Sequence, residues 1–192
     1  MLSDRFTNAI KLAAELHSDQ LRKGTNIPYI SHLLGVTSLV LEHGGNEDEA
    51  IAAMLHDAVE DQGGEETLEL INTQFGVNVA AIVQGCTDSY EIPKPSWRDR
   101  KENYIKHLAA ASPSVRLVSN ADKLHNARAI LNDLRVCGES LWQRFNGGRE
   151  GTLWYYKSLA KTFKELNNGA LAEELNRTVR EIERISQVQL RE

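Results

Sequence analysis

Met54-Leu55-His56-Asp57-Ala58-Val59-Glu60-Asp61 places four polar side chains inside an otherwise apolar run. Successive residues of a helix step by about 100°, so these four residues would share one helix face. The apolar residues occupy the rest of the circumference and are predicted to pack into a core. An imidazole beside a carboxylate suits divalent cations such as Mn²⁺, Fe²⁺, Zn²⁺ or Mg²⁺. The stretch therefore predicts a core helix that supplies half of a metal site.

Helical periodicity continues on both sides of this stretch. Asn46, with Glu49 three residues on, forms a capping-box pattern that opens the helix. Ser3 is predicted to cap a first helix that ends near Lys23, with Gly24 as its stop. The other expected helices cover about 30–43, 65–74, 96–108, 115–134, 152–166 and 170–188, and 88–97 forms a long loop. Because no alternating pattern is long enough for a sheet, the predicted fold is an all-α helical bundle.

Length and composition limit the class of protein. A chain of 192 residues suits a single domain over 1–192. The net charge of −5 argues against a nucleic-acid partner, because general nucleic-acid binders usually carry a basic face. No apolar run approaches the roughly 18 residues that span a bilayer, and the N-terminus lacks a signal-peptide pattern. We therefore expect no membrane partner. Cys86 and Cys137 are isolated, which is typical of a reducing compartment, so we expect a cytoplasmic protein.

The other half of the metal site must come from elsewhere in the chain. His32 follows Pro28 at a predicted helix start, and Asp122 lies between Ala121 and Leu124 in an apolar-flanked segment. Burying an ionised carboxylate is costly unless it is paired or bound to a cation. From spacing alone, His32 is also compatible with a core or helix-terminal histidine, and Asp122 with a solvated helix position. Both stay candidate ligands, because helical bundles bring distant ligands together.

Five segments, in their order and spacing, resemble a known family. They are Gln20-Leu21-Arg22-Lys23-Gly24, Pro28-Tyr29-Ile30-Ser31-His32, Leu55-His56-Asp57-Ala58-Val59-Glu60-Asp61, Phe75-Gly76-Val77 and Ala121-Asp122-Lys123-Leu124-His125-Asn126. The chain resembles the HD-superfamily hydrolase domain of RelA/SpoT proteins, and above all its stand-alone members, the small alarmone hydrolases. The likeness covers roughly 4–135 and continues more weakly through Tyr155, Tyr156 and Ala160.

The resemblance implies a metal centre with a catalytic acidic pair. It implies one Mn²⁺ held by His32, His56, Asp57 and Asp122. Four protein ligands leave coordination positions for water and a phosphate oxygen. Glu60 and Asp61 match the family's catalytic acids, which orient or deprotonate the attacking water and assist the leaving group.

The resemblance also implies a nucleotide-binding set. Its members are Arg22, Lys23, Asn126 and Tyr155, with Tyr156 as the alternative to Tyr155. An Arg-Lys pair at a helix end is also favoured by the helix dipole, and packing is an alternative role for the tyrosine. Lys94, Arg98, Arg100 and Lys101 form a basic cluster that either meets the distal phosphates or is a solvated charged face.

The implied activity is Mn²⁺-dependent removal of pyrophosphate from the 3′ position of (p)ppGpp, which returns GDP or GTP. One alternative is hydrolysis of another 2′- or 3′-phosphorylated nucleotide such as NADPH, and a second is a nucleotide sensor without turnover. The chain departs from the usual family pattern at Leu33, Ser119, Asn120 and Ala129, none of which is an implied metal ligand. The resemblance places Ser119, Asn120 and Ala129 beside the nucleotide, so it specifies the substrate less closely than the hydrolysis.

Overall fold

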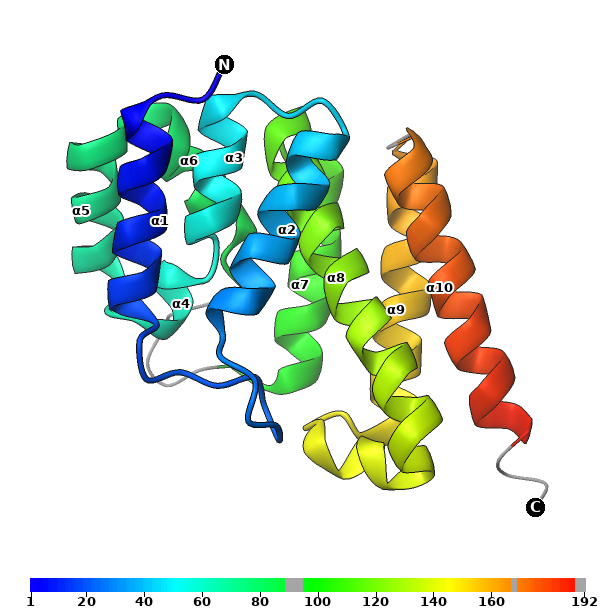
Figure 1. Cartoon of the computed structure of the whole chain (residues 1–192). Coiled ribbons are helices and arrows are strands. Elements are labelled where there is room, and N and C mark those ends of the chain that lie inside the picture. Colours follow the sequence, from blue (N-terminus) through cyan, green and yellow to red (C-terminus); the bar gives the residue numbers. More distant parts are fainter. Residues whose placement is uncertain (89–94, 167–168, 189–192) are drawn as a thin grey trace. The chain divides into compact units, whose positions relative to one another are not determined.

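The computed structural model describes residues 1–88, 95–166 and 169–188, and the regular elements within these ranges are helices (Figure 1). The elements are α1 (Asp4–Leu16), α2 (Ile30–Glu42), α3 (Glu47–Leu55), α4 (Ala58–Asp61), α5 (Glu65–Phe75), α6 (Val77–Cys86), α7 (Trp97–Ala110), α8 (Pro113–Cys137), the 3₁₀ helix η1 (Gly138–Arg144), α9 (Gly148–Glu165) and α10 (Gly169–Val188). Within these ranges the β-type pairing is an isolated antiparallel bridge between Leu21 and Pro28, and no strand forms. The predicted all-α fold is confirmed.

The chain divides into two compact units. Unit 1 comprises residues 1–94 and 111–121, and unit 2 comprises residues 95–110 and 122–192. Unit 1 contains α1 to α6 and the beginning of α8, whereas unit 2 contains α7, the rest of α8, η1, α9 and α10. The single domain expected over 1–192 stays a prediction.

Helix α3 forms the centre of unit 1. It packs against α1, α2 and α6 (Figure 1), and every residue from Ala50 to Leu55 is fully buried. A helix that is apolar around its circumference is expected to be buried in this way. Its start is fixed by Asn46, whose side chain accepts from the Glu49 N–H at 3.0 Å while Glu49 Oε2 accepts from the Asn46 N–H at 2.8 Å. The predicted core helix and its capping box are confirmed.

The expected single helix through Met54–Asp61 is wrong in one respect. Helix α3 ends at Leu55, and His56 and Asp57 form a turn before the short α4. Asp57 has φ −97° and ψ −6°, which lies in the sparsely populated region between helix and strand where many active-site residues are found. The step of about 100° per residue therefore does not hold across the turn. The directions of the four polar side chains are set by the turn in the backbone and not by one continuous helix face.

The first helix is shorter than expected. Ser3 caps it as predicted, accepting from the Arg5 N–H at 3.2 Å, but α1 ends at Leu16 rather than near Lys23. The following backbone makes other hydrogen bonds, because the carbonyl of Gln20 accepts from the N–H of Tyr29 at 2.9 Å. Residues 17–29, which we call the 17–29 loop, therefore fold back on themselves between α1 and α2.

Unit 2 is built on α9, which packs against α7, η1 and α10. Trp97, at the start of α7, lies directly on Gly147 and Gly151, where an added Cβ would come within 2.7 and 3.2 Å of the indole ring. The expected closing helices are confirmed, whereas the sequence pattern did not predict η1. Of the expected long loop, residues 89–94 lie outside the described residues. No helix in the described part of the chain is long and apolar enough to cross a membrane.

Asn46→Ala is expected to destabilise the protein by about 1 kcal/mol, because it removes the side-chain acceptor of the capping box at the start of α3. For a chain of this size, that loss corresponds to a fall in Tm of roughly 2–4 °C, measured by calorimetry. Asn72→Ala, at an exposed site on α5, is the matched control and should leave Tm nearly unchanged. Equal Tm values for the two variants would contradict the capping role.

Candidate metal centre

Two histidines and an aspartate of unit 1 converge into a compact group, the histidine–aspartate cluster: His32, His56 and Asp57. Their ligand atoms all lie within 4.8 Å of one another. Asp57 Oδ2 lies 3.1 Å from His56 Nε2 and 3.4 Å from His32 Nε2. Ligands held at about 2.0–2.2 Å from one divalent ion lie at comparable separations. The cluster thus has the donor types and the spacing that a divalent metal requires.

The sequence positions both imidazoles for ligation. His32 is in the first turn of α2, as predicted, and His56 is in the turn after α3; their side chains are 1% and 2% exposed. The carbonyl of Ala53 lies 2.8 Å from His56 Nδ1, which donates to it and thereby leaves the Nε2 lone pair directed at the cluster. This arrangement fixes tautomer and ring orientation in metal-binding histidines.

Tyr29 contributes a contact that the sequence analysis missed. Its hydroxyl donates to Asp57 Oδ2 at 2.6 Å, and its ring meets the His32 ring edge-on at 5.5 Å between centroids. In the sequence, Tyr29 stands out only as part of the segment from Pro28 to His32. Its position three residues before His32, about one helical turn away, is the signal that places both side chains on the same side of the loop–helix junction.

Both predicted catalytic acids lie on α4, within one turn of Asp57. The N–H of Asp61 donates to the carbonyl of Asp57 at 3.0 Å. Asp61 is exposed and Glu60 is half-buried. The side chain of Gln20, from the 17–29 loop, donates to Asp61 Oδ2 at 2.8 Å. The turn between α3 and α4 thus presents the acids next to the cluster along the chain.

Arg22 lies beside the cluster through Tyr29. Its guanidinium carbon is 5.7 Å from the centroid of the Tyr29 ring, whereas Lys23 is exposed. The Thr25 hydroxyl donates to the Arg22 carbonyl at 2.9 Å, which fixes the backbone here. The alternative role of this basic pair at a helix end is wrong, because α1 ends six residues before Arg22.

Asp122 and Asn126 belong to the part of α8 in unit 2. Asp122 is buried, so the solvated position considered from spacing is wrong. Asn126 Nδ2 donates to its Oδ1 at 2.5 Å, and the Lys123 ammonium donates to its Oδ2. Burial lowers the pKa of the Lys123 ammonium, whereas the neighbouring Asp122, Tyr104 and Tyr155 together raise it by a larger amount. The pKa of Lys123 therefore stands well above its usual range. The buried carboxylate therefore has the cationic partner that burial requires.

Tyr155, on α9, is buried in an aromatic group. Its ring lies 6.2 Å from that of Trp97 and 5.8 Å from that of Tyr156, and Lys101 Nζ is 5.1 Å from its centroid. Packing is thus an observed role of this residue. Its contact with a nucleotide stays a prediction.

The basic cluster is only partly described, because Lys94 lies outside the described residues. The guanidinium of Arg98 stacks on the Trp154 ring at 3.2 Å, and its Nε donates to Glu102 at 2.6 Å. Arg98 is therefore engaged within unit 2. A role in binding phosphates stays a prediction for Arg100 and Lys101.

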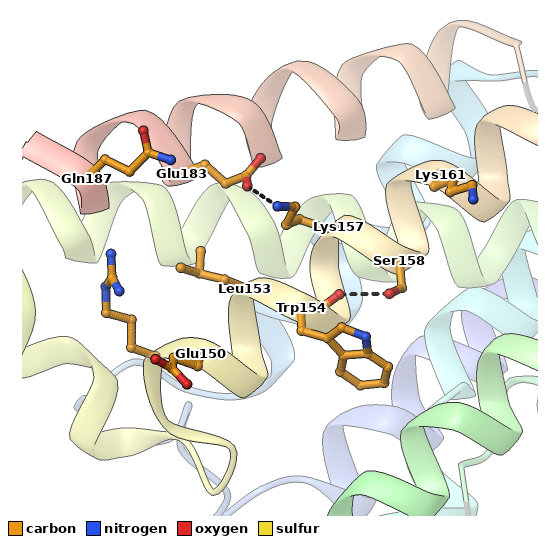
Figure 2. Close-up of a pocket in the computed structure, with 9 residues that line it drawn as sticks. Glu150, Leu153, Trp154, Lys157, Ser158, Lys161, Glu183 and Gln187 are labelled. Carbon is orange, nitrogen blue, oxygen red and sulfur yellow. Dashed lines mark hydrogen bonds and ion pairs between the residues drawn. The ribbon is translucent and has the colours of Figure 1, made fainter.

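An open groove of about 780 Å³ runs along α9 and α10 within unit 2 (Figure 2). Lys157 Nζ pairs with Glu183 across it at 2.7 Å, and Arg149 donates to the Ser186 carbonyl at 3.0 Å. None of the predicted metal, catalytic or substrate-binding residues lines this groove. Its cations already have protein partners, so the groove adds nothing to the chemistry of the cluster.

The sequence of the chain matches the HD domain family model over residues 9–153. The chain belongs to this family. Among its relatives is the guanosine-3′,5′-bis(diphosphate) 3′-pyrophosphohydrolase MESH1 of Xenopus tropicalis, 40% identical over 70% of this chain and 72% of that protein. The human MESH1 is 36% identical over 72% of this chain and 74% of that protein.

Solved structures agree with this assignment. A metazoan ortholog of SpoT, described as hydrolysing ppGpp, matches with a TM-score of 0.77 and 27% identity over 94% of this chain and 96% of that one. A Listeria monocytogenes protein matches with a TM-score of 0.68 and 28% identity over 77% of this chain and 96% of that one. Within the HD domain family, the chain therefore belongs to the MESH1-like group of SpoT-related proteins, which confirms the resemblance.

Proposed function

We propose that this protein is a Mn²⁺-dependent hydrolase that removes pyrophosphate from the 3′ position of (p)ppGpp and returns GDP or GTP. The observation that carries the proposal is the histidine–aspartate cluster, in which two buried imidazoles and the half-buried Asp57 carboxylate gather their ligand atoms within 4.8 Å. Relatives of 36–40% identity that carry the name guanosine-3′,5′-bis(diphosphate) 3′-pyrophosphohydrolase support the choice of substrate.

The metal is assigned to His32, His56 and Asp57, with Asp122 as the fourth ligand. Neutral nitrogen with anionic oxygen suits a borderline divalent cation, and Mn²⁺ is the ion that we assign within that group. When bound, such an ion polarises a phosphoryl oxygen and lowers the pKa of a coordinated water. Asp122 supports the assignment because its carboxylate is buried and accepts from Lys123 and Asn126, and such contacts orient a carboxylate that binds a metal.

Proton transfer is assigned to Glu60 and Asp61. Water attacks the phosphorus next to the ribose, the bond from that phosphorus to O3′ breaks, and pyrophosphate leaves with the water oxygen. Glu60 accepts the proton that the attacking water loses, and O3′ takes up one proton, for which Asp61 is the proposed donor. Both acids need only hydrogen-bond reach of the reacting atoms, directly or through one water.

Nucleotide binding is assigned to Arg22 and Asn126 at the nucleoside and to Lys23 at a phosphate, with Tyr155 as a further contact. A guanidinium stacks on a purine, and an ammonium pairs with a phosphate as a point charge. Arg22 already lies over an aromatic ring, that of Tyr29, which supports its placement beside the centre. We also propose a cytoplasmic location, because Cys86 and Cys137 are not joined in a disulfide.

The proposal is tested with purified protein against ppGpp, pppGpp and NADPH, with and without added Mn²⁺. The expected result is release of pyrophosphate from ppGpp and pppGpp that depends on Mn²⁺. Release of orthophosphate from NADPH alone would assign another nucleotide substrate. Tight binding of ppGpp without turnover would make the protein a sensor. Repeating the assay with Mg²⁺, Fe²⁺ and Zn²⁺ tests the choice of metal.

Arg22→Ala is expected to raise KM for ppGpp about tenfold while kcat changes little, because a stacking contact is made equally in the ground state and the transition state. Steady-state kinetics measure the two constants separately. Arg116→Ala, on α8, serves as the control for loss of one positive charge and should leave KM unchanged. An unchanged KM in Arg22→Ala would remove Arg22 from the binding set.

A further inference from the structure

The 17–29 loop holds two side chains against the centre, one on a proposed ligand and one on a proposed acid. Tyr29 donates to Asp57 Oδ2 at 2.6 Å, and Gln20 donates to Asp61 Oδ2 at 2.8 Å. We propose that Tyr29 and Gln20 are positioning residues, which fix the metal ligand Asp57 and the acid Asp61 in their working orientations. This inference rests on the proposed function.

The amide of Gln20 has its orientation fixed by two other contacts. Its Oε1 accepts from Gln62 Nε2 at 2.7 Å and lies 2.6 Å from His17 Nδ1. An amide oxygen has two lone pairs, and with both in use the NH₂ group must face Asp61. Gln62 directly follows Asp61 at the end of α4. The Gln20 amide therefore links the 17–29 loop to two adjacent residues, Asp61 and Gln62. Rotation of Asp61 would break this arrangement.

His17 connects the two contacts. Its ring stacks on that of Tyr29 with centroids 5.3 Å apart and planes 21° apart, while its Nδ1 holds the Gln20 amide. His17 is buried, and the Tyr29 ring also meets His32 edge-on. The tyrosine therefore lies between two imidazoles, which leaves its hydroxyl little freedom to leave Asp57.

The two positioning residues are expected to affect different quantities. A hydrogen bond to a ligating carboxylate orients that ligand, and loss of such a bond typically costs 10–100-fold in metal affinity. A hydrogen bond to an acid that transfers protons affects the rate, because proton transfer requires a positioned partner. Tyr29 should thus govern metal affinity and Gln20 the chemical step.

The first test is Tyr29→Phe, which keeps the stacked ring and removes only the hydroxyl. Titration calorimetry with Mn²⁺ alone should show an affinity lower by about 10–100-fold. Gln20→Leu is the matched control and should bind Mn²⁺ like the wild type. Wild-type affinity in Tyr29→Phe would overturn the role of Tyr29. This measurement needs no substrate, so it decides the point even where a failed nucleotide assay has refuted the proposed function.

The second test is the kinetics of Gln20→Leu at saturating Mn²⁺. We expect kcat, referred to the folded fraction measured by circular dichroism, to fall by roughly tenfold with KM unchanged. His17→Phe keeps the ring stack but loses Nδ1, so it should lower kcat in the same way. The double variant that combines His17→Phe with Gln20→Leu should be no slower than Gln20→Leu alone, because both changes act through the Gln20 amide. A wild-type kcat in Gln20→Leu, or additive losses in the double variant, would overturn the role of Gln20.

Discussion

Asp57→Ala is expected to abolish metal binding and turnover together. The cluster would lose its carboxylate and keep only its two imidazoles, and Asp57 Oδ2 is the atom that both Nε2 atoms face, at 3.1 and 3.4 Å. A metal ion supplies several kcal/mol of transition-state stabilisation in hydrolysis, and each 1.36 kcal/mol is a factor of ten in rate. We therefore expect kcat/KM for ppGpp to fall by about 10³-fold or more.

Metal content by mass spectrometry, Mn²⁺ titration and the pyrophosphate-release assay measure these losses. Asp19→Ala removes an exposed carboxylate from the 17–29 loop and is the matched control, with metal content and activity like those of the wild type. Full activity in Asp57→Ala would show that the residue is no ligand. Retention of the metal with loss of turnover would move Asp57 into a purely catalytic role.

Glu60→Gln is expected to keep the metal and lose most of the rate. The substitution preserves the size of the side chain but removes its capacity to accept a proton. General base catalysis contributes about 10²–10⁴-fold, so kcat should fall within that range. Mn²⁺ affinity should stay within a few-fold of the wild type, because Glu60 follows the cluster by one turn and is not among the three converging ligands.

Single-turnover measurements with Mn²⁺-loaded protein separate the chemical step from product release. Glu66→Gln, at an exposed position in the first turn of α5, is the control for loss of one negative charge. If Glu60→Gln instead loses the metal, Glu60 is a ligand. If its kcat is unchanged, Asp61 alone carries the proton transfers, and the proposed division between the two acids is wrong.

Periodicity and capping chemistry were sufficient to predict most helices, because these signals are local. The run from Ala50 to Leu55 is apolar on every side, so its burial follows directly from the sequence. The capping box at Asn46 is likewise a contact between residues three positions apart. The predicted end of α1 near Lys23 is wrong because the carbonyl of Gln20 accepts from the N–H of Tyr29. This contact joins residues nine positions apart, and helical periodicity does not predict it.

The centre itself shows the same division between local and distant information. His56 and Asp57 are neighbours in the chain, and their convergence with His32 was predicted from the family likeness rather than from spacing. The turn at Asp57 could not be predicted, because its sequence is compatible with continued helix and only φ and ψ reveal the break. The contacts of Gln20 and Tyr29 depend on how the 17–29 loop folds back, which no periodic pattern encodes.

We propose that one divalent ion is held by His32, His56, Asp57 and Asp122. A crystal structure of the Mn²⁺-loaded protein, with anomalous scattering recorded at the manganese edge, would locate this ion. We expect a single strong anomalous peak about 2.2 Å from both Nε2 atoms, from Asp57 Oδ2 and from an oxygen of Asp122. A peak bound elsewhere, or one that Asp122 does not reach, would contradict it.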